Sequence, residues 1–261
     1  MVVVRIEDAG DQRLAAFTSI RERDLHNRGD GRFIVEGLIA LKTLLTRSRF
    51  PVESLLVLDS KLPAVAALMA GLSDDVPVYA VSQPVIDRVA GYPVHRGVLA
   101  CARKSTSLQI DDLLGMSRLL VLNQISNHDN VGAAFRNAAA FGIEGVVLDQ
   151  GSCDPLYRKA IRVSAGASLY LPYVKAGTGS QHLEYLTAHG FDIWAMTPRR
   201  TATALGDLPV PKRLALVLGA EGPGLPADMI ARATAVRIPM VDDFDSLNVA
   251  TAAAIAMAHI F

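Results

Sequence analysis

The sequence predicts an α/β fold in which a small α/β domain precedes a larger domain built on a parallel sheet. Apolar runs of strand length alternate with segments of helical pattern along the whole chain. Some of these runs, such as 119–123 and 214–218, are continuously apolar, which is typical of strands buried on both faces of a parallel sheet. A polar stretch of broken pattern separates two such series. We therefore expect a first domain at 1–104, a linker at 105–118 and a second domain at 119–261.

In the first domain the pattern predicts a strand at 33–37 that leads into a helix at 38–46. Leu38, Leu41 and Leu45 share one face of that helix at helical spacing. The remaining elements are expected to alternate as strand 53–59, helix 64–71, strand 76–81, helix 83–90 and strand 97–102.

In the second domain the apolar runs predict strands at 119–123, 145–149, 170–174, 191–196, 214–218 and 236–238. Asn130 is expected to cap a helix at 131–141 that Gly142 ends, and Pro226 is expected to open another helix. Ser246 is a candidate cap of the last helix. The other helices are predicted around 158–162, at 181–188 and at 247–260.

Composition limits the classes of function. The chain has 261 residues and a formal net charge of zero, so any RNA contact must be a local patch rather than bulk electrostatic attraction. It has no run of about 18 apolar residues and no signal-like start, which favours a cytoplasmic protein without a membrane segment. Cys101 and Cys153 make neither a disulfide framework nor a metal site. We expect no metal, because no His/Cys/Asp cluster would supply its ligands.

The carboxyl ends of four expected strands mark the candidate binding site. Ligands of open α/β sheets bind outside these ends, and the loops after 123, 196, 218 and 238 are predicted to converge there. No G-x-G-x-x-G follows the first of these strands and no G-K-[ST] is present, which excludes a Rossmann fingerprint and a P-loop. A glycine-rich turn, GAEGPG, comes late instead, at 219–224. Its glycines allow the backbone to approach a ligand closely.

Three segments carry a family resemblance. They are LNQISNHDNVGAAFRNAAAFG at 122–142, LALVLGAEGPGLPADMI at 214–230 and RIPMVDDFDSLNVATAAAIAMAHIF at 237–261. In this order they resemble the three motifs of the SpoU family, ribose 2′-O-methyltransferases of the SPOUT superfamily that act on RNA. The first domain, with VEG and HRGVLA, is similar to the RNA-binding module of the larger members. The resemblance implies a parallel sheet with helices on both faces, a deep trefoil knot, S-adenosyl-L-methionine as cofactor and a homodimer.

The resemblance also implies the residues of the site. Those expected to hold S-adenosylmethionine, largely through backbone groups and apolar contact, are Thr197, Gly219, Glu221, Ile238, Met240 and Leu247. The polar catalytic set is Asn130, Arg136, Glu221, Ser246 and Asn248. The family implies that Arg136 takes or polarises the proton of the 2′-hydroxyl, with Glu221 as a candidate ion-pair partner. Residue chemistry favours another role for Arg136, a grip on a substrate phosphate, because a guanidinium is not normally deprotonated.

Two basic clusters are candidates for RNA contact. One is Arg21, Arg23, Arg28 and Arg32, and the other is Arg158, Lys159 and Arg162 on one predicted helix. Ordinary solvated surface is the alternative for both, since Glu22, Asp24 and Asp30 neutralise the first cluster. Near the third motif, Asp242, Asp243 and Asp245 stand where the family commonly has a glycine, and they would repel an RNA phosphate if they faced it.

The leading hypothesis is an RNA ribose 2′-O-methyltransferase that acts on 23S (large-subunit) ribosomal RNA. Ribosomal RNA is favoured because the tRNA enzymes of the family tend to lack the first domain. The alternatives are a tRNA 2′-O-methyltransferase and a non-catalytic RNA-binding protein that keeps the fold. A generic doubly wound nucleotide enzyme is disfavoured by the absent fingerprints.

Overall fold

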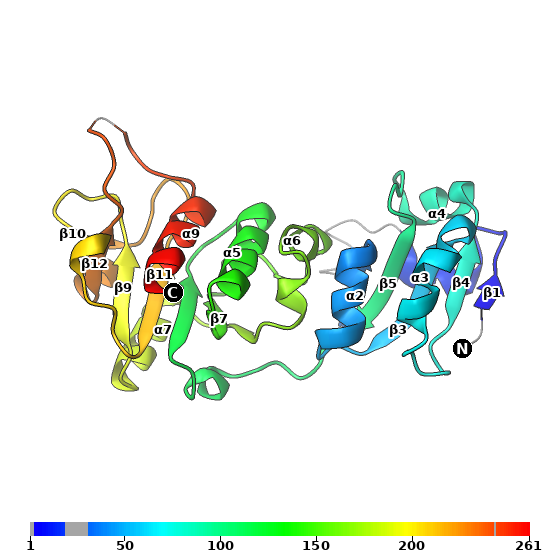
Figure 1. Cartoon of the computed structure of the whole chain (residues 1–261), viewed down its shortest axis with the longest axis horizontal. Helices are drawn as coiled ribbons and strands as arrows, with labels where there is room; N and C mark the ends of the chain where they lie inside the picture. Colours follow the sequence, from blue (N-terminus) through cyan, green and yellow to red (C-terminus); the bar gives the residue numbers. More distant parts are fainter. Residues whose placement is uncertain (1–2, 19–30, 243) are drawn as a thin grey trace. The chain divides into compact units, whose positions relative to one another are not determined.

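The computed structural model describes residues 3–18, 31–242 and 244–261. The chain forms two compact units, shown in Figure 1. The first comprises 1–106 and 156–170, and the second comprises 107–155 and 171–261. In the described part of the chain, none of the helices has both the length and the apolar character needed to span a bilayer.

The first unit is built on a five-stranded mixed sheet in the order β1-β4-β3-β5-β2. β4 pairs in parallel with both β1 and β3, whereas β5 pairs antiparallel with β3 and β2. The expected alternation of strands and helices is confirmed, with an additional strand, β1, at the start. The strands are β1 (Val3–Arg5), β2 (Arg32–Glu36), β3 (Val52–Leu58), β4 (Val78–Val81) and β5 (Val98–Arg103). The helices are α2 (Leu38–Arg47), α3 (Leu62–Met69) and α4 (Gln83–Ala90).

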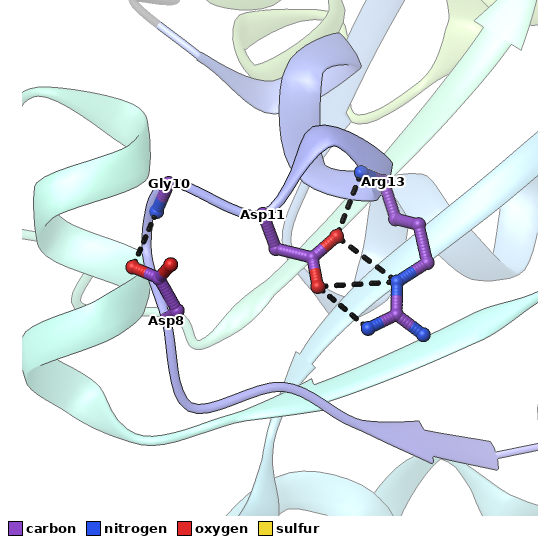
Figure 2. A network of polar contacts seen from close by, with 4 residues as sticks. All are labelled: Asp8, Gly10, Asp11 and Arg13. Atoms are coloured by element: carbon purple, nitrogen blue, oxygen red, sulfur yellow. Dashed lines mark hydrogen bonds and ion pairs between the residues drawn. The ribbon is translucent and has the colours of Figure 1, made fainter.

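A short 3-10 helix, η1 (Gln12–Phe17), buries Leu14 and Phe17 against the same core as α4. Its start is fixed by Asp11, whose Oδ1 accepts a hydrogen bond of 2.9 Å from the backbone N–H of Arg13 (Figure 2). The hydrogen-bonded Arg13 guanidinium lowers the pKa of Asp11 to about 2. The sequence pattern missed η1 because six residues are too few to establish a helical period.

The segment Leu156–Tyr170 packs with the first unit although it lies between two strands of the second. It contains α6 (Arg158–Val163) and a 3-10 turn, η4 (Ala167–Leu169). The guanidinium of Arg47 on α2 lies 3.6 Å from the ring centroid of Tyr170. A helix predicted at this place in the sequence is therefore present, but its packing partners come from the N-terminal sheet.

The second unit is built on a seven-stranded sheet in which every strand pairing is parallel. The strand order is β10-β12-β9-β11-β6-β7-β8. This confirms the predicted parallel sheet, while the trefoil knot stays a prediction. The strands are β6 (Arg118–Leu122), β7 (Gly145–Leu148), β8 (Tyr173–Lys175), β9 (Asp192–Met196), β10 (Thr203–Ala204), β11 (Leu214–Leu218) and β12 (Thr234–Arg237).

Helices cover both faces of this sheet. Alternate strand residues such as Val121, Ala195 and Val217 share a buried core with α7 (Gly179–Ala188) and α8 (Ala227–Ala231). α5 (His128–Ala140) and α9 (Val249–Ile260) pack against each other, and Asn137 of α5 donates a 3.0 Å hydrogen bond to the Ala250 carbonyl. Three short 3-10 turns complete the chain: η2 (Asp59–Lys61), η3 (Ile110–Leu113) and η5 (Leu205–Asp207).

Two predicted helix caps are wrong. Asn127, not Asn130, caps α5: its side chain accepts a 2.8 Å hydrogen bond from the Asp129 N–H, and Asn130 lies inside the first turn. Asn248, not Ser246, caps α9 by accepting from the N–H groups of Ala250 and Thr251. In both cases the sequence offers several capping residue types in a row, and propensity alone does not choose among them.

Candidate active site

The carboxyl ends of β12, β9, β11 and β6 are neighbours in the sheet, as predicted. A pocket opens there between the loops that follow β9, β11 and β12 and the start of α9. All its lining residues belong to the second unit. Every residue predicted to hold the cofactor lines it, namely Thr197, Gly219, Glu221, Ile238, Met240 and Leu247, and so does Ser246.

Gly219 begins the tight turn that forms one wall of the pocket. The Gly224 N–H donates a 3.0 Å hydrogen bond to the Ala220 carbonyl, so the turn folds back on itself. A Cβ atom added at Gly219 would lie 2.5 Å from the backbone carbon of Gly224 and from the Leu225 nitrogen. Backbone cannot retreat as a flexible side chain does, and this position therefore requires glycine.

Thr197 fixes a second wall. Its backbone N–H donates a 2.9 Å hydrogen bond to the Val236 carbonyl, and its hydroxyl accepts from the Arg199 N–H at 3.4 Å. Thr197 is buried, so the loop after β9 is anchored where it leaves the sheet. Arg199 lines the same pocket, and it is a site residue that the motifs did not indicate. The sequence indicated Arg199 only through its position directly after a strand that ends at the predicted binding edge.

Three of the predicted catalytic residues form one hydrogen-bonded cluster beside the pocket. Asn130 donates from Nδ2 to Oε1 of Glu221. Asn248 donates from Nδ2 to the same Oε1 at 3.2 Å and to Oδ1 of Asn130 at 3.1 Å. The oxygen of Asn248 caps α9, which orients its amide so that the nitrogen must face Glu221. The cluster thus joins the start of α5, the glycine-rich turn and the start of α9.

Glu221 in this cluster has only neutral partners. Its Oε1 accepts from two amides, whereas its Oε2 has no partner among the described residues. The side chain is exposed at the pocket wall. An exposed carboxylate without a cation keeps its negative charge available for a ligand.

Arg136 lies on α5, six residues after Asn130, and its side chain is exposed. Among the ion pairs of the described residues, none joins it to Glu221, so the hypothesis of an Arg136–Glu221 pair is not supported. Ser246 is exposed at the pocket rim just before the cap of α9. The roles of both residues stay predictions.

The residues predicted to contact RNA have different surroundings. Arg21, Arg23 and Arg28 lie outside the described residues. Arg32 forms an ion pair of 2.7 Å with Glu53. Arg158 is largely buried, pairs with Glu36 and lies 4.5 Å over the ring of Tyr92. Lys159 and Arg162 are both exposed on the same helix. Arg200 pairs at 3.0 Å with Asp242, one of the three acids that depart from the family pattern.

Comparison with known proteins agrees with this geometry. The model of the SpoU rRNA Methylase family matches residues 117–258. An uncharacterized tRNA/rRNA methyltransferase of Mycobacterium bovis is 39% identical over 257 residues, which cover 95% of this chain and 88% of that protein. The 23S rRNA (guanosine-2′-O-)-methyltransferase RlmB of Acinetobacter baylyi is 31% identical over 196 residues, covering 70% of this chain and 77% of RlmB.

A solved structure shares the whole fold. The AdoMet-bound rRNA methyltransferase of Sinorhizobium meliloti superposes with a TM-score of 0.82 at 20% identity, covering 99% of this chain and 97% of the other. The family match at 117–258 spans the first two motifs and most of the third, and its range includes Asn130, Glu221 and Asn248. The chain therefore belongs to the SpoU family of RNA 2′-O-methyltransferases.

Proposed function

We propose that this enzyme transfers the methyl group of S-adenosylmethionine to a ribose 2′-hydroxyl of large-subunit ribosomal RNA. The observation that carries the proposal is the Asn130–Glu221–Asn248 cluster, which stands at the wall of a pocket made by three loops of a parallel sheet. Methyl transfer to an alcohol oxygen needs an in-line approach and little acid–base chemistry beyond removal of one proton, so positioning is the main task of the site.

The pocket fits the proposed cofactor chemically. Its wall combines apolar side chains, such as Ile238, Met240 and Leu247, with the exposed backbone of the turn at 219–224. Apolar surface would cover an adenine ring, while backbone N–H and C=O groups would pair with its edge. The S. meliloti protein of the same fold binds AdoMet, which supports the same ligand here. When bound, S-adenosylmethionine supplies an electrophilic methyl group on a sulfonium.

Arg136 is proposed to bind the phosphate beside the target ribose. Its guanidinium is exposed and has no partner among the described residues, so its donors are available for a bidentate contact. A guanidinium stays protonated at neutral pH, which argues against a role as a free base. Glu221, held by two amides, is the negative group of the cluster and is proposed to keep Asn130 and Asn248 oriented toward the substrate.

Ribosomal RNA is the proposed substrate because the chain carries an additional compact unit besides the one that contains the seven-stranded sheet. The A. baylyi relative is named for methylation of 23S rRNA, which supports this choice, whereas the M. bovis relative is named for tRNA or rRNA. In the first unit, Arg162 on α6 is exposed and suits phosphate contact. Arg32 and Arg158 are already paired with acids, so any contribution of theirs to RNA binding would compete with Glu53 and Glu36.

A homodimer is part of the proposal. Ile255 of α9 and Phe261 directly after the helix are exposed, and the many alanines of α9 would allow another helix to approach closely. A second copy covering this face would remove that apolar surface from water.

The test is transfer of labelled methyl from S-adenosylmethionine to unmodified 23S RNA and to total tRNA, followed by nucleoside analysis. Label in a 2′-O-methylated nucleoside of 23S RNA is the expected result. Label in tRNA alone would mean that tRNA, and not ribosomal RNA, is the substrate. Binding of S-adenosylhomocysteine without transfer to either RNA would favour the non-catalytic alternative. Gly219→Ala should abolish S-adenosylhomocysteine binding, while Gly206→Ala, where a Cβ meets nothing within 4 Å, should leave it unchanged.

A further inference from the structure

A buried carboxylate outside the motifs holds the turn that leads into α5. Asp149 directly follows β7 and is 1% exposed. Its Oδ1 accepts from the Gln124 N–H at 2.9 Å, from the Ser152 N–H at 3.1 Å and from the Ser152 hydroxyl at 2.6 Å. Its Oδ2 accepts from the side-chain amide of Gln124. No ion pair to it is found among the described residues, and these hydrogen bonds compensate for its burial.

Ser152 extends this network by one residue. Its hydroxyl donates to Asp149 and accepts a 3.0 Å hydrogen bond from the Ile125 N–H. The Cys153 N–H in turn donates a hydrogen bond of 2.9 Å to the Ile125 carbonyl. The backbone at Gln124 and Ile125 is therefore fixed from the segment 149–153, more than twenty residues later in the chain.

The turn fixed in this way has an unusual backbone. Gln124 adopts a φ of +59°, in the left-handed region that L-residues with side chains rarely occupy. Such a conformation persists where surrounding contacts determine it, and it is often found near functional sites. Gln124 donates two hydrogen bonds to Asp149, one from its backbone N–H and one from its side-chain amide.

The turn sets the position of catalytic residues. Three residues after Gln124, Asn127 caps α5, and Asn130 in the first turn of that helix contacts Glu221 and Asn248. An altered turn would shift the start of α5 and, with it, Asn130. The pocket walls come from other segments, the loops after β9, β11 and β12, and meet this part of the chain through the hydrogen bond of Asn130 to Glu221.

We infer that Asp149 and Ser152 are positioning residues for methyl transfer, acting through Gln124 and Ile125 on the start of α5. The inference rests on the proposed methyltransferase function. It adds to the motif residues a pair that lies in a different part of the sequence. A purely structural role would lower stability and leave turnover intact, whereas a positioning role lowers turnover by more than the loss of stability accounts for.

The test compares Ser152→Ala with Ile193→Val. Both change a buried residue of the second unit, but Ile193 belongs to the core that includes α7 and, unlike Ser152, has no side-chain group that could hydrogen-bond to the turn. Matched falls in Tm are expected for the two variants. Ser152→Ala should also lower kcat ~10- to 100-fold with an unchanged KM for S-adenosylmethionine, because a displacement of reacting groups by about 1 Å has effects of that size. Ser152→Thr, which keeps the oxygen, should restore turnover.

Amide hydrogen exchange gives a readout that does not depend on activity. In Ser152→Ala the peptide covering 124–135 should exchange faster, and in Ile193→Val it should not. Equal kcat values for the two variants, or unchanged exchange over 124–135, would overturn the inference. If the wild-type protein methylates neither RNA, the proposed function fails instead, and the exchange experiment still decides whether Asp149 and Ser152 hold the turn.

Discussion

Each unit contains a cluster of side chains around one glutamate, and the two glutamates differ in their burial and in the charge of their partners. In the first unit, Glu36 is 6% exposed, pairs with Arg158 and accepts a 3.4 Å hydrogen bond from the Tyr92 hydroxyl. In the second unit, Glu221 is exposed and is held by the amides of Asn130 and Asn248. The first acid is neutralised by a cation inside the protein. The second keeps its charge at the edge of a pocket.

The difference shows how the surroundings of an arginine decide its role. Arg158 and Arg136 both lie on helices that follow a strand and a loop, and both were candidates for contact with the RNA substrate. Arg158 forms an ion pair with Glu36 and lies over the ring of Tyr92. Burial raises the pKa of Tyr92 to about 12, so this tyrosine stays protonated. Arg136 has no internal partner among the described residues and remains available for a substrate. The three predictions that follow test this contrast.

The largest effect is expected for Arg136→Ala. We expect transfer to RNA to fall by at least ~100-fold, because the variant loses a charge-assisted contact that orders the reacting ribose. Affinity for S-adenosylhomocysteine and the Tm should stay near the wild-type values, since the side chain has no partner within the described protein. Single-turnover methyl transfer and calorimetric titration would measure the two quantities. A stable variant with wild-type turnover would contradict the assignment.

Arg158→Met is expected to act on stability instead. Removing the guanidinium leaves Glu36 buried without its cation, which costs about 3 kcal/mol in comparable ion pairs. The matched control is Arg162→Met on the same helix, where the exposed side chain should change stability by less than about 0.5 kcal/mol.

Thermal unfolding would compare the two variants, and Glu36→Gln combined with Arg158→Met should recover much of the loss. If Arg162→Met and Arg158→Met destabilise equally, the ion pair with Glu36 does not have the role that we assign to it.

Glu221→Gln should have the smallest effect of the three. The substitution keeps the shape and one accepting oxygen for Asn130 and Asn248 but removes the charge. We expect kcat to fall by about 10-fold, the size typical of one lost charge-assisted interaction, with the Tm nearly unchanged. Steady-state kinetics over a range of S-adenosylmethionine concentrations would measure this fall in kcat. Undiminished turnover would mean that the hydrogen bonds of Glu221 matter and its charge does not.

Much of the fold was predictable because local patterns carry it. The buried strands of the second unit, from 119–123 to 214–218, read as continuous apolar runs, and α4 was predicted with its observed bounds, Gln83–Ala90. The convergence of the loops after β9, β11 and β12 on one pocket followed from the rule for parallel sheets, whereas the loop after β6, also predicted there, does not line that pocket. Elements of two or three residues, such as β10 and β1, were missed because alternation needs more residues to become visible.

The motifs identified which residues gather at the pocket, but only the tertiary structure decided how they pair. The hydrogen bonds of Asn130 to Glu221 and of Asn248 to Asn130 span 91 and 118 residues of sequence, and the Arg158–Glu36 pair spans 122. Local sequence patterns cover only a few neighbouring residues and do not predict contacts between residues so far apart in the sequence. A prediction from residue type treats Arg158, Lys159 and Arg162 as one basic face, whereas burial beside an acid separates Arg158 from the others.

The sequence by itself determined the order of strands and helices, the loops that meet at the binding edge and the family to which the motifs belong. These properties depend on the spacing of apolar residues and glycines along the chain. The tertiary structure decided which asparagine caps which helix, which acid is neutralised and which carboxylate, Asp149, holds the turn before α5. These depend on contacts between segments distant in sequence, where the cost of burying a charge or leaving an N–H unpaired selects one partner among several.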